Sequence, residues 1–461
     1  MAQTTRRSFM QSMAAATAAS AVVASGANAL KARAESPNGK LQHACIGVGG
    51  MGWNDFKQFL LHPNTDVVAL CDVDEQRLSA ALEEAKKHGK QPRTYIDWRE
   101  LLEKEEGKID SVNVTVPDHM HCAIAIAAIH KGKHVYCQKP MCHDVAEVRA
   151  LTIAAKKAGV ITQLGTQLAS GYGDRTAVHW MREGVIGKVK RIVLCANRPG
   201  AIERYRLEGP RPEKGDTPPA YLNWDLWLGT APERDFSPKI YHPAIWRAWQ
   251  DFGTGWSGDI GCHVFDAVWK GLDLQPPKFV IADVQESWKN DPARRRDTWP
   301  QSDHITWIFP GNKMTERELL PIEWFDGLIF PHADVQALSP IKPYPGEAAM
   351  VIGTEGTILL PLSKMPLLLP HTKFRDHSGP DLEPRNHYHH FVDACLGKAK
   401  NESFFARTGP MTEAILLGTV AIRTPGVMLQ WDHDRMAIPN YPEAEKFLKR
   451  DYREGWAVET T

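Results

Sequence analysis

The segment Gly47-Val48-Gly49-Gly50-Met51-Gly52 has glycines at the spacing of a phosphate-binding turn, between an apolar run and a helical pattern. Glycines let the backbone turn tightly and approach a pyrophosphate, whose charge the N-terminus of the following helix stabilises. We therefore predict that a dinucleotide binds here, in contact with Gly47, Gly49, Gly50, Met51 and Gly52.

A glycine-rich turn alone is weak evidence, and Asp72 adds a second element. It ends the next apolar run, DVVALCD, at a distance in sequence from Gly47 that is typical of dinucleotide sites. A carboxylate there accepts hydrogen bonds from ribose hydroxyls and repels a 2′-phosphate. The pattern therefore favours NAD over NADP.

Two further groups have the residue types for proton transfer. Lys139 follows an apolar run at the sheet edge where doubly wound folds bind ligands. Asp259, His263 and Asp266 share one face if the segment is a helix. His263 is then a candidate to accept a proton. Asp259 would bind substrate hydroxyls or orient the imidazole, and Asp266 is a candidate partner of that ring.

The elements that must position these residues begin with an α/β domain. From His43 onward, strand-like apolar runs alternate with helical patterns at 52–61, 75–88, 119–131 and 144–158. This alternation predicts a parallel sheet with right-handed crossovers. We assign residues 38–165 to a Rossmann domain with a doubly wound sheet.

The pattern of apolar and loop-forming residues changes after residue 165. Longer Pro- and Gly-rich loops separate strand candidates at 190–197, 278–287, 303–310, 348–354 and 356–362, several of which alternate in polarity. Such strands predict a largely antiparallel sheet. Residues 166–461 are therefore expected to form an α+β domain that binds substrate, with a C-terminal tail that is a candidate to pack back on the first domain.

The first 34 residues have the pattern of an export address. Paired arginines in Thr5-Arg6-Arg7-Ser8-Phe9-Met10 precede an Ala-rich stretch and small-residue cleavage sites, which resembles a twin-arginine signal. We expect residues 1–34 to be a signal peptide and the protein to be periplasmic or extracellular. Because this route carries folded proteins, the cofactor would be loaded before export.

Composition excludes several classes of protein. Lys plus Arg and Asp plus Glu each number 55, so the chain lacks the broad positive field typical of nucleic-acid binding. No apolar run is long enough to span a membrane. The eight Cys residues are scattered without a CxxC pair, and the run Asn386-His387-Tyr388-His389-His390 is interpreted as the start of a helix, so no metal site is predicted.

Beyond these patterns, the sequence resembles the Gfo/Idh/MocA family of sugar and inositol oxidoreductases. The resemblance extends from about residue 40 to 456. One departure is Gln138, where the family usually has Glu. The motifs that carry the resemblance are Val114-Thr115-Val116-Pro117, His121, Gly132-Lys133-His134-Val135-Tyr136-Cys137-Gln138-Lys139-Pro140 and Gly258-Asp259-Ile260-Gly261-Cys262-His263.

The resemblance implies hydride transfer between NAD and a secondary hydroxyl carbon of a sugar, glycoside or cyclic polyol. Lys139, His263 and Asp259 then form the catalytic set. The expected contacts with NAD include Pro117, His121, Gln138 and Lys139 in addition to the glycine turn and Asp72. Trp246, Trp249 and Trp256 either stack on a sugar ring or pack between domains.

Two alternatives remain open at the level of sequence. One is a glycosidase that oxidises a ring hydroxyl transiently with the same NAD, eliminates the aglycone, adds water and returns the hydride. The other is a non-catalytic nucleotide-binding protein, which only Gln138 favours. The expected partner is a small carbohydrate, the family implies a homo-oligomer (dimer or tetramer), and scarce NAD outside the cytoplasm suggests a tightly held cofactor.

Overall fold

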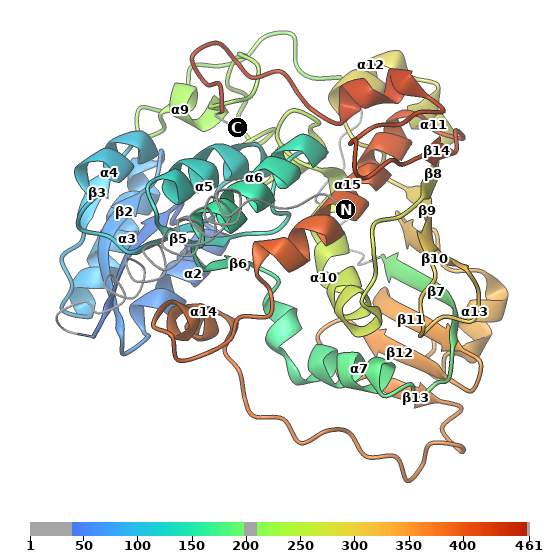
Figure 1. The fold of residues 1–461 in the computed structure, drawn as a ribbon. Helices are drawn as coiled ribbons and strands as arrows, with labels where there is room; N and C mark the ends of the chain where they lie inside the picture. Colours follow the sequence, from blue (N-terminus) through green and yellow to red (C-terminus); the bar gives the residue numbers. More distant parts are fainter. Residues whose placement is uncertain (1–38, 198–209, 459–461) are drawn as a thin grey trace, which may run out of the picture.

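Two sheets lie side by side in this computed structural model, which describes residues 39–197 and 210–458. The predicted signal peptide lies outside these residues. A six-stranded sheet forms the blue and teal part of Figure 1, and an eight-stranded sheet lies opposite it. The long helices α10 (Gly255–Leu272) and α15 (Phe405–Arg423) run between them.

The first sheet is entirely parallel and has the strand order β3-β2-β1-β4-β5-β6. The order changes direction between β1 and β4, where doubly wound sheets bind ligands. Its strands are β1 (Leu41–Ile46), β2 (Thr65–Cys71), β3 (Arg93–Tyr95), β4 (Ser111–Val114), β5 (His134–Cys137) and β6 (Thr162–Leu164). Its helices are α2 (Met51–Leu60), α3 (Glu75–Lys87), α4 (Trp98–Lys104), α5 (His121–His130) and α6 (Val145–Ala158).

The second sheet has the order β13-β12-β11-β7-β10-β9-β8-β14, and only the β7–β10 pair is parallel. The predicted α/β domain and mostly antiparallel second sheet are therefore confirmed. Its strands are β7 (Val189–Ala196), β8 (Phe279–Val284), β9 (Asp303–Pro310), β10 (Leu319–Asp326), β11 (Glu347–Gly353), β12 (Thr357–Pro361), β13 (Leu367–Leu369) and β14 (Leu429–Gln430).

Strand β10 was not among the strand candidates because Pro321 and Glu323 interrupt its apolar pattern. The structure explains the charged residue. Arg191 on β7 donates a 2.6 Å hydrogen bond from Nε to Glu323 Oε2, so the carboxylate is paired across the two strands. The short strand β3 and helix α4 were also missed.

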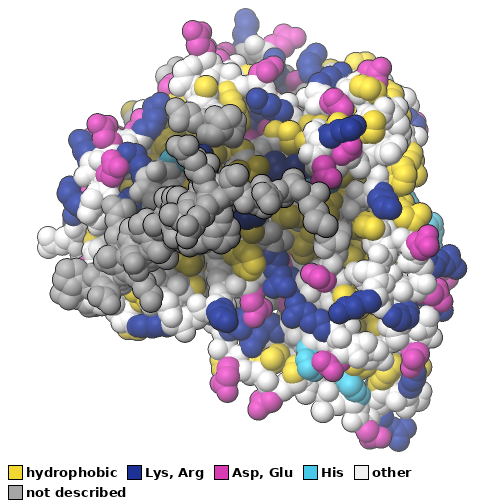
Figure 2. Space-filling view, viewed as in Figure 1, with side chains coloured by type: hydrophobic (Ala, Val, Ile, Leu, Met, Phe, Trp, Pro, Cys, Tyr) yellow, Lys and Arg dark blue, Asp and Glu magenta, His cyan; other side chains and the backbone are white. Residues whose placement is uncertain are grey.

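The remaining helices are short or peripheral. They are α7 (Tyr172–Arg182), α9 (Trp224–Leu228), α11 (Glu286–Lys289), α12 (Pro292–Asp297), α13 (Ala333–Leu338) and α14 (His387–Cys395), with the 3₁₀ turns η1 (Asp118–Met120), η2 (Gln167–Ser170), η3 (Ile245–Ala248) and η4 (Pro442–Phe447). In the described part of the chain, no helix has the length and apolarity that a membrane span needs. On the face shown in Figure 2, acidic and basic side chains are interspersed.

C-terminal segments return to the first domain. Helix α14 begins at His387, whose N-cap is Asn386, and its Tyr388 and Phe391 pack with Phe59 in one apolar cluster. Helix α15 packs on α6, where Arg149 Nε donates to Glu413 Oε1 at 2.7 Å. The two domains are therefore joined by elements far apart in sequence.

Arg450 anchors the tail that follows α15. Its NH2 group donates to Glu147 Oε1 at 2.7 Å and to Thr230 Oγ1 at 2.9 Å, and the Glu147 side chain is only 1 % exposed. Asp144 lies 3.7 Å from the same guanidinium. The tail thus compensates two acidic residues at the N-terminus of α6.

Replacing Arg450 by Met should destabilise the protein. The change leaves Glu147 and Asp144 without their cation, and breaking a buried ion pair in this way costs about 3 kcal/mol. Chemical denaturation followed by circular dichroism should show a lower unfolding midpoint. The neighbouring exposed residue gives the control Lys449→Met, which should unfold like the wild type. Equal midpoints for both variants would contradict the anchoring role.

Candidate functional site

A cleft of about 680 Å³ lies at the carboxyl ends of the strands of the first sheet. One side is formed by the glycine turn after β1 and by the segments that follow β2, β4 and β5. The other side is formed by residues from the segment 226–247, the first turns of α10 and the loop around Ser363. The cleft therefore coincides with the point where the strand order reverses.

The glycine turn has a shape that side chains would prevent. Gly47 has φ +82°, and a Cβ there would lie 2.1 Å from the carbonyl oxygen of Thr115. A Cβ on Gly52 would lie 2.1 Å from the carbonyl oxygen of Gly47. Gly50 has φ +57° and open space around it. The first and last glycines thus allow close packing, and Gly50 presents bare backbone.

The N-terminus of α2 next to this turn fits an anion. The helix has no side-chain cap and no acidic residue in its first turn. The positive dipole end of α2 therefore lies at the cleft, and no side chain of its first turn competes with an anion there. The open backbone at Gly50 leaves room for a pyrophosphate, and Gly47, Gly49, Gly50, Met51 and Gly52 all line the cleft. These residues fit a dinucleotide.

Asp72 lines the same cleft at the end of β2. Its Oδ2 accepts a 2.8 Å hydrogen bond from the backbone N–H of Val48, and its Oδ1 accepts one of 3.0 Å from Asp74. Asp72 therefore also holds the glycine turn against β2. The nearby cation Arg77 covers Gly49, and its Nε donates to Asp74 Oδ2 at 3.1 Å.

Lys139 is joined to α10 across the cleft. Its Nζ donates to Asp259 Oδ1 at 2.7 Å and to the Asp259 carbonyl oxygen at 2.8 Å. Arg247 Nε lies 3.3 Å from the same Oδ1. Burial by itself raises the pKa of Asp259, but the Lys139 and Arg247 charges outweigh burial and hold that pKa well below its usual range. Asp259 is therefore a permanent anion between two cations.

His263 lines the cleft together with Lys139 and Asp259. It lies one helical turn after Asp259 on α10, as the spacing predicted. Asp266, the predicted partner of the His263 ring, instead pairs with other residues. Its Oδ1 lies 2.7 Å from Lys270 Nζ, and Thr166 donates to its Oδ2 at 3.4 Å. The candidate catalytic group in the cleft is thus Lys139, Asp259 and His263.

Gln138 is matched to a buried carboxylate that the sequence did not reveal. Its Nε2 donates to Asp55 Oδ2 at 2.8 Å, and Thr115 and Tyr388 donate to the same carboxylate at 2.8 Å each. Burial raises the pKa of Asp55 to about 6 against these hydrogen bonds. A Glu at 138 would place a second acid against Asp55, so the amide suits this environment.

Of the predicted cofactor contacts Pro117 and His121, one lines the cleft and the other does not. Pro117 lines the cleft. His121 is not among the lining residues; it is buried behind the wall, where its Nδ1 lies 2.8 Å from the Pro140 carbonyl oxygen and its Nε2 lies 2.8 Å from that of Val116. His121 therefore ties the segment after β4 to the turn after Lys139.

The three tryptophans near α10 divide between the two expected roles. Trp246 and Trp256 line the cleft, and the Arg247 guanidinium lies 4.2 Å from the Trp246 ring centre. Trp249 does not line the cleft; it is buried in an apolar cluster with Tyr241 and Phe252, to which Trp246 also belongs. Trp256 is therefore placed for contact with a ligand, Trp249 for packing, and Trp246 for both.

Three charged residues of the cleft were missed by sequence reasoning: Arg77, Asp118 and Arg247. Asp118 directly follows Pro117, and Arg247 directly follows Trp246. Their position beside residues that had been singled out was the only signal available. Their distance in sequence from Lys139 and Asp259 hid the fact that all four line one cleft.

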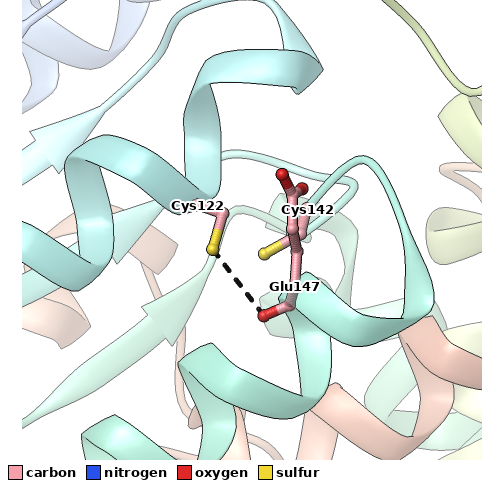
Figure 3. Close-up of side chains that lie close together, drawn as sticks. All are labelled: Cys122, Cys142 and Glu147. Atoms are coloured by element: carbon pink, nitrogen blue, oxygen red, sulfur yellow. Dashed lines mark hydrogen bonds between the residues drawn. The ribbon is translucent and has the colours of Figure 1, made fainter. Parts of the chain in front are cut away.

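Cys122, Cys142 and Glu147 are buried and lie close together, as Figure 3 shows. Their potential ligand atoms lie within 4.8 Å of one another. The carboxylate of Glu147 is already engaged: Arg450 and Tyr452 donate to Oε1, and the His143 N–H donates to Oε2. The adjacent guanidinium also opposes a cation there. This cluster therefore fits a buried packing contact better than a metal site.

Known proteins resemble the chain in sequence over part of its length. Levoglucosan dehydrogenase from Pseudarthrobacter phenanthrenivorans is 29 % identical over 195 residues, which are 42 % of this chain and 40 % of the relative. Glycosyl hydrolase family 109 protein 1 from Shewanella sp. (strain ANA-3) is 26 % identical over 149 residues, or 31 % of this chain and 32 % of the relative. The chain thus matches less than half the length of these curated relatives.

Solved structures share the fold over most of the chain. The WlbA dehydrogenase from Bordetella pertussis, solved with NADH and UDP-GlcNAcA, has a TM-score of 0.58 at 16 % identity. The match covers 85 % of this chain and 99 % of that one. An inositol dehydrogenase homologue from Azotobacter vinelandii, solved with NADH and myo-inositol, has a TM-score of 0.56 at 16 % identity over 85 % and 98 % of the two chains.

Two family models match adjacent parts of the sequence. Residues 41–166 match the oxidoreductase family model with an NAD-binding Rossmann fold, and residues 181–337 match the C-terminal alpha/beta domain of the same family. Together they span more than half of the chain, and the unmatched residues 167–180 between them lie between the last strand of the first sheet and the first strand of the second. The chain therefore belongs to the Gfo/Idh/MocA family of oxidoreductases.

Proposed function

We propose that this protein is an NAD-dependent oxidoreductase that acts on a secondary hydroxyl of a sugar, glycoside or cyclic polyol. The observation that carries the proposal is that Lys139, Asp259 and His263 line the same cleft as the glycine turn. Dehydrogenases and reductases of sugars and inositol among the relatives support this class of substrate.

The residues of the cleft have distinct parts in this reaction. NAD, when bound, accepts the hydride from the substrate carbon. His263 takes the hydroxyl proton as a general base. Asp259 fixes the Lys139 ammonium through two hydrogen bonds, which leaves a third N–H of Lys139 to donate to the substrate oxygen. Trp246 and Trp256 provide apolar surface for a sugar ring.

NAD is favoured over NADP by the adenosine end of the cleft. The Asp72 carboxylate would repel a 2′-phosphate. Arg77, the cation that would attract one, is engaged by Asp74.

A tightly held cofactor is supported by the segment 221–252, which lies against the first domain. Backbone hydrogen bonds join Asn223 to Val73 and Glu75 to Tyr221, and His242 Nε2 lies 3.3 Å from Asp74 Oδ2. Leu226, Trp227 and His242 from this segment line the cleft. We infer that the segment encloses the adenosine half of the cofactor. A retained cofactor suits export of the folded protein by the twin-arginine route, which is part of this proposal. We further propose that the protein forms a homodimer or homotetramer.

Gly47→Ala should abolish dinucleotide binding. The added Cβ would meet the Thr115 carbonyl at 2.1 Å and would strain the turn at φ +82°. Native mass spectrometry should detect NAD on the purified wild-type protein and none on the variant. Gly89→Ala is the matched control, since Gly89 has φ +71° but open space around it and lies on a surface turn. Equal nucleotide content in wild type and Gly47→Ala would refute the assignment of the turn.

Lys139→Met and His263→Asn should each lower kcat by about 10²-fold or more, because the first removes the hydrogen-bond donor to the substrate oxygen and the second removes the general base. Both variants should still bind NADH, as followed by nucleotide fluorescence. Lys131→Met, which removes an exposed ion pair with Glu106, should leave turnover unchanged. Full activity of either cleft variant across a panel of sugars and polyols would count against the proposed mechanism.

A glycosidase that uses NAD only transiently is the second candidate, and the glycosyl hydrolase family 109 relatives favour it. In that reaction, oxidation of a ring hydroxyl acidifies the adjacent C–H, the aglycone leaves, water adds, and the hydride returns. Release of an aglycone from a synthetic glycoside without net NADH, with solvent deuterium in the sugar, would establish it. Accumulation of keto-sugar with NADH would establish the dehydrogenase.

A further inference from the structure

Asp118 is an acidic residue of the cleft that has no part in the reaction outlined above. It opens η1 directly after Pro117, in the segment that follows β4, and only 1 % of its surface is exposed. Thr254 Oγ1, at the start of α10, donates a 3.0 Å hydrogen bond to Asp118 Oδ2. Asp118 therefore lines the cleft while it links the first domain to the helix of Asp259 and His263.

The groups near Asp118 carry one excess positive charge. Lys139 and Arg247 are cations, and the Asp259 carboxylate compensates one of them. Ionised Asp118 would compensate the other. The titratable and charged groups around it are Cys137 on β5, Lys139 after β5, Arg247 on η3, and Asp259, Cys262 and His263 on α10.

Burial and the neighbouring Asp259 charge raise the pKa of Asp118 to about 7, against the opposing effects of Arg247, Lys139 and the Thr254 hydrogen bond. At neutral pH, both protonation states are therefore accessible. A change of one charge in the cleft is enough to shift the balance between them.

The redox state of a nicotinamide is such a change of charge. In doubly wound sheets a dinucleotide lies across the crevice, with its pyrophosphate at the glycine turn. Asp72 follows β2 on one side of this turn, whereas Asp118 and Lys139 follow β4 and β5 on the other. The nicotinamide half therefore belongs to the side of Asp118. Its ring carries a positive charge when oxidised and none when reduced.

We propose that Asp118 couples the redox state of the bound cofactor to a proton: the carboxyl group is ionised beside oxidised NAD and is protonated when the cofactor is reduced. In the forward reaction, a hydride moves from the substrate carbon to the cofactor, the hydroxyl proton moves to His263, and Asp118 takes a proton from solvent. The inference rests on the proposed function and adds a charge-compensating residue to its site.

Competition of NAD⁺ against bound NADH, followed by NADH fluorescence from pH 6 to 8.5, tests the coupling. Ionised Asp118 strengthens binding of the cationic form, so the ratio Kd(NAD⁺)/Kd(NADH) should fall as pH rises. The expected total fall is about tenfold, because a pKa difference of one unit between the two complexes corresponds to a factor of ten. Asp118→Asn, which keeps an acceptor oxygen for Thr254, should make the ratio independent of pH.

Two controls separate Asp118 from other groups. Asp381→Asn removes an exposed carboxylate and should retain the wild-type slope, as should His263→Asn. Loss of the slope in His263→Asn with retention in Asp118→Asn would assign the proton to His263 and overturn the inference.

A second measurement does not depend on any variant. Displacement of NAD⁺ by NADH on the wild-type protein in weakly buffered solution should take up protons at pH 7 and fewer at pH 9, as read by an indicator dye. If both nucleotides bind but the ratio Kd(NAD⁺)/Kd(NADH) does not depend on pH, the role of Asp118 is overturned and the proposed function is not. Failure to bind either nucleotide would overturn the proposed function as well.

Discussion

The ion pair between Lys139 and Asp259 is the interaction on which the site depends. It joins the loop after the fifth strand of one domain to the first turns of α10 from the other, with a donor–acceptor distance of 2.7 Å. Both side chains are mostly buried, so each charge relies on the other and on Arg247 for compensation. Because one partner comes from each domain, the geometry of the cleft requires that the domains keep a fixed relation.

The packing around α10 supplies that fixed relation. Helix α15 packs against both α6 and α10, so a C-terminal helix lies between the parallel sheet and the rest of the molecule. The tail anchored by Arg450 then returns to the N-terminus of α6 and to the η1 backbone. The last strand of the first sheet ends at Leu164, and the final segments of the chain contact both units.

The chemistry of the cleft follows from unequal environments of its two carboxyl groups. Asp259 binds the Lys139 and Arg247 cations directly and stays ionised. The same two charges also act on Asp118, but burial and the Asp259 charge outweigh them and raise its pKa. Environments that separate the pKa values of neighbouring acids are a common way to assign different tasks to them. Here one carboxylate orients the Lys139 ammonium, and we assign the other to charge compensation.

The sequence by itself determined the local features. Glycine spacing, the acid at the end of β2 and the four-residue spacing of Asp259 and His263 depend on backbone conformation and on helix and strand periodicity, which neighbouring residues report. Tertiary structure alone decided which distant side chains share the cleft. The pairing of Gln138 with Asp55, the retreat of His121 behind the wall and the arrival of Arg247 and Asp118 depend on contacts between elements remote in sequence. Such contacts are set by the packing of whole helices and sheets, and no local pattern encodes them.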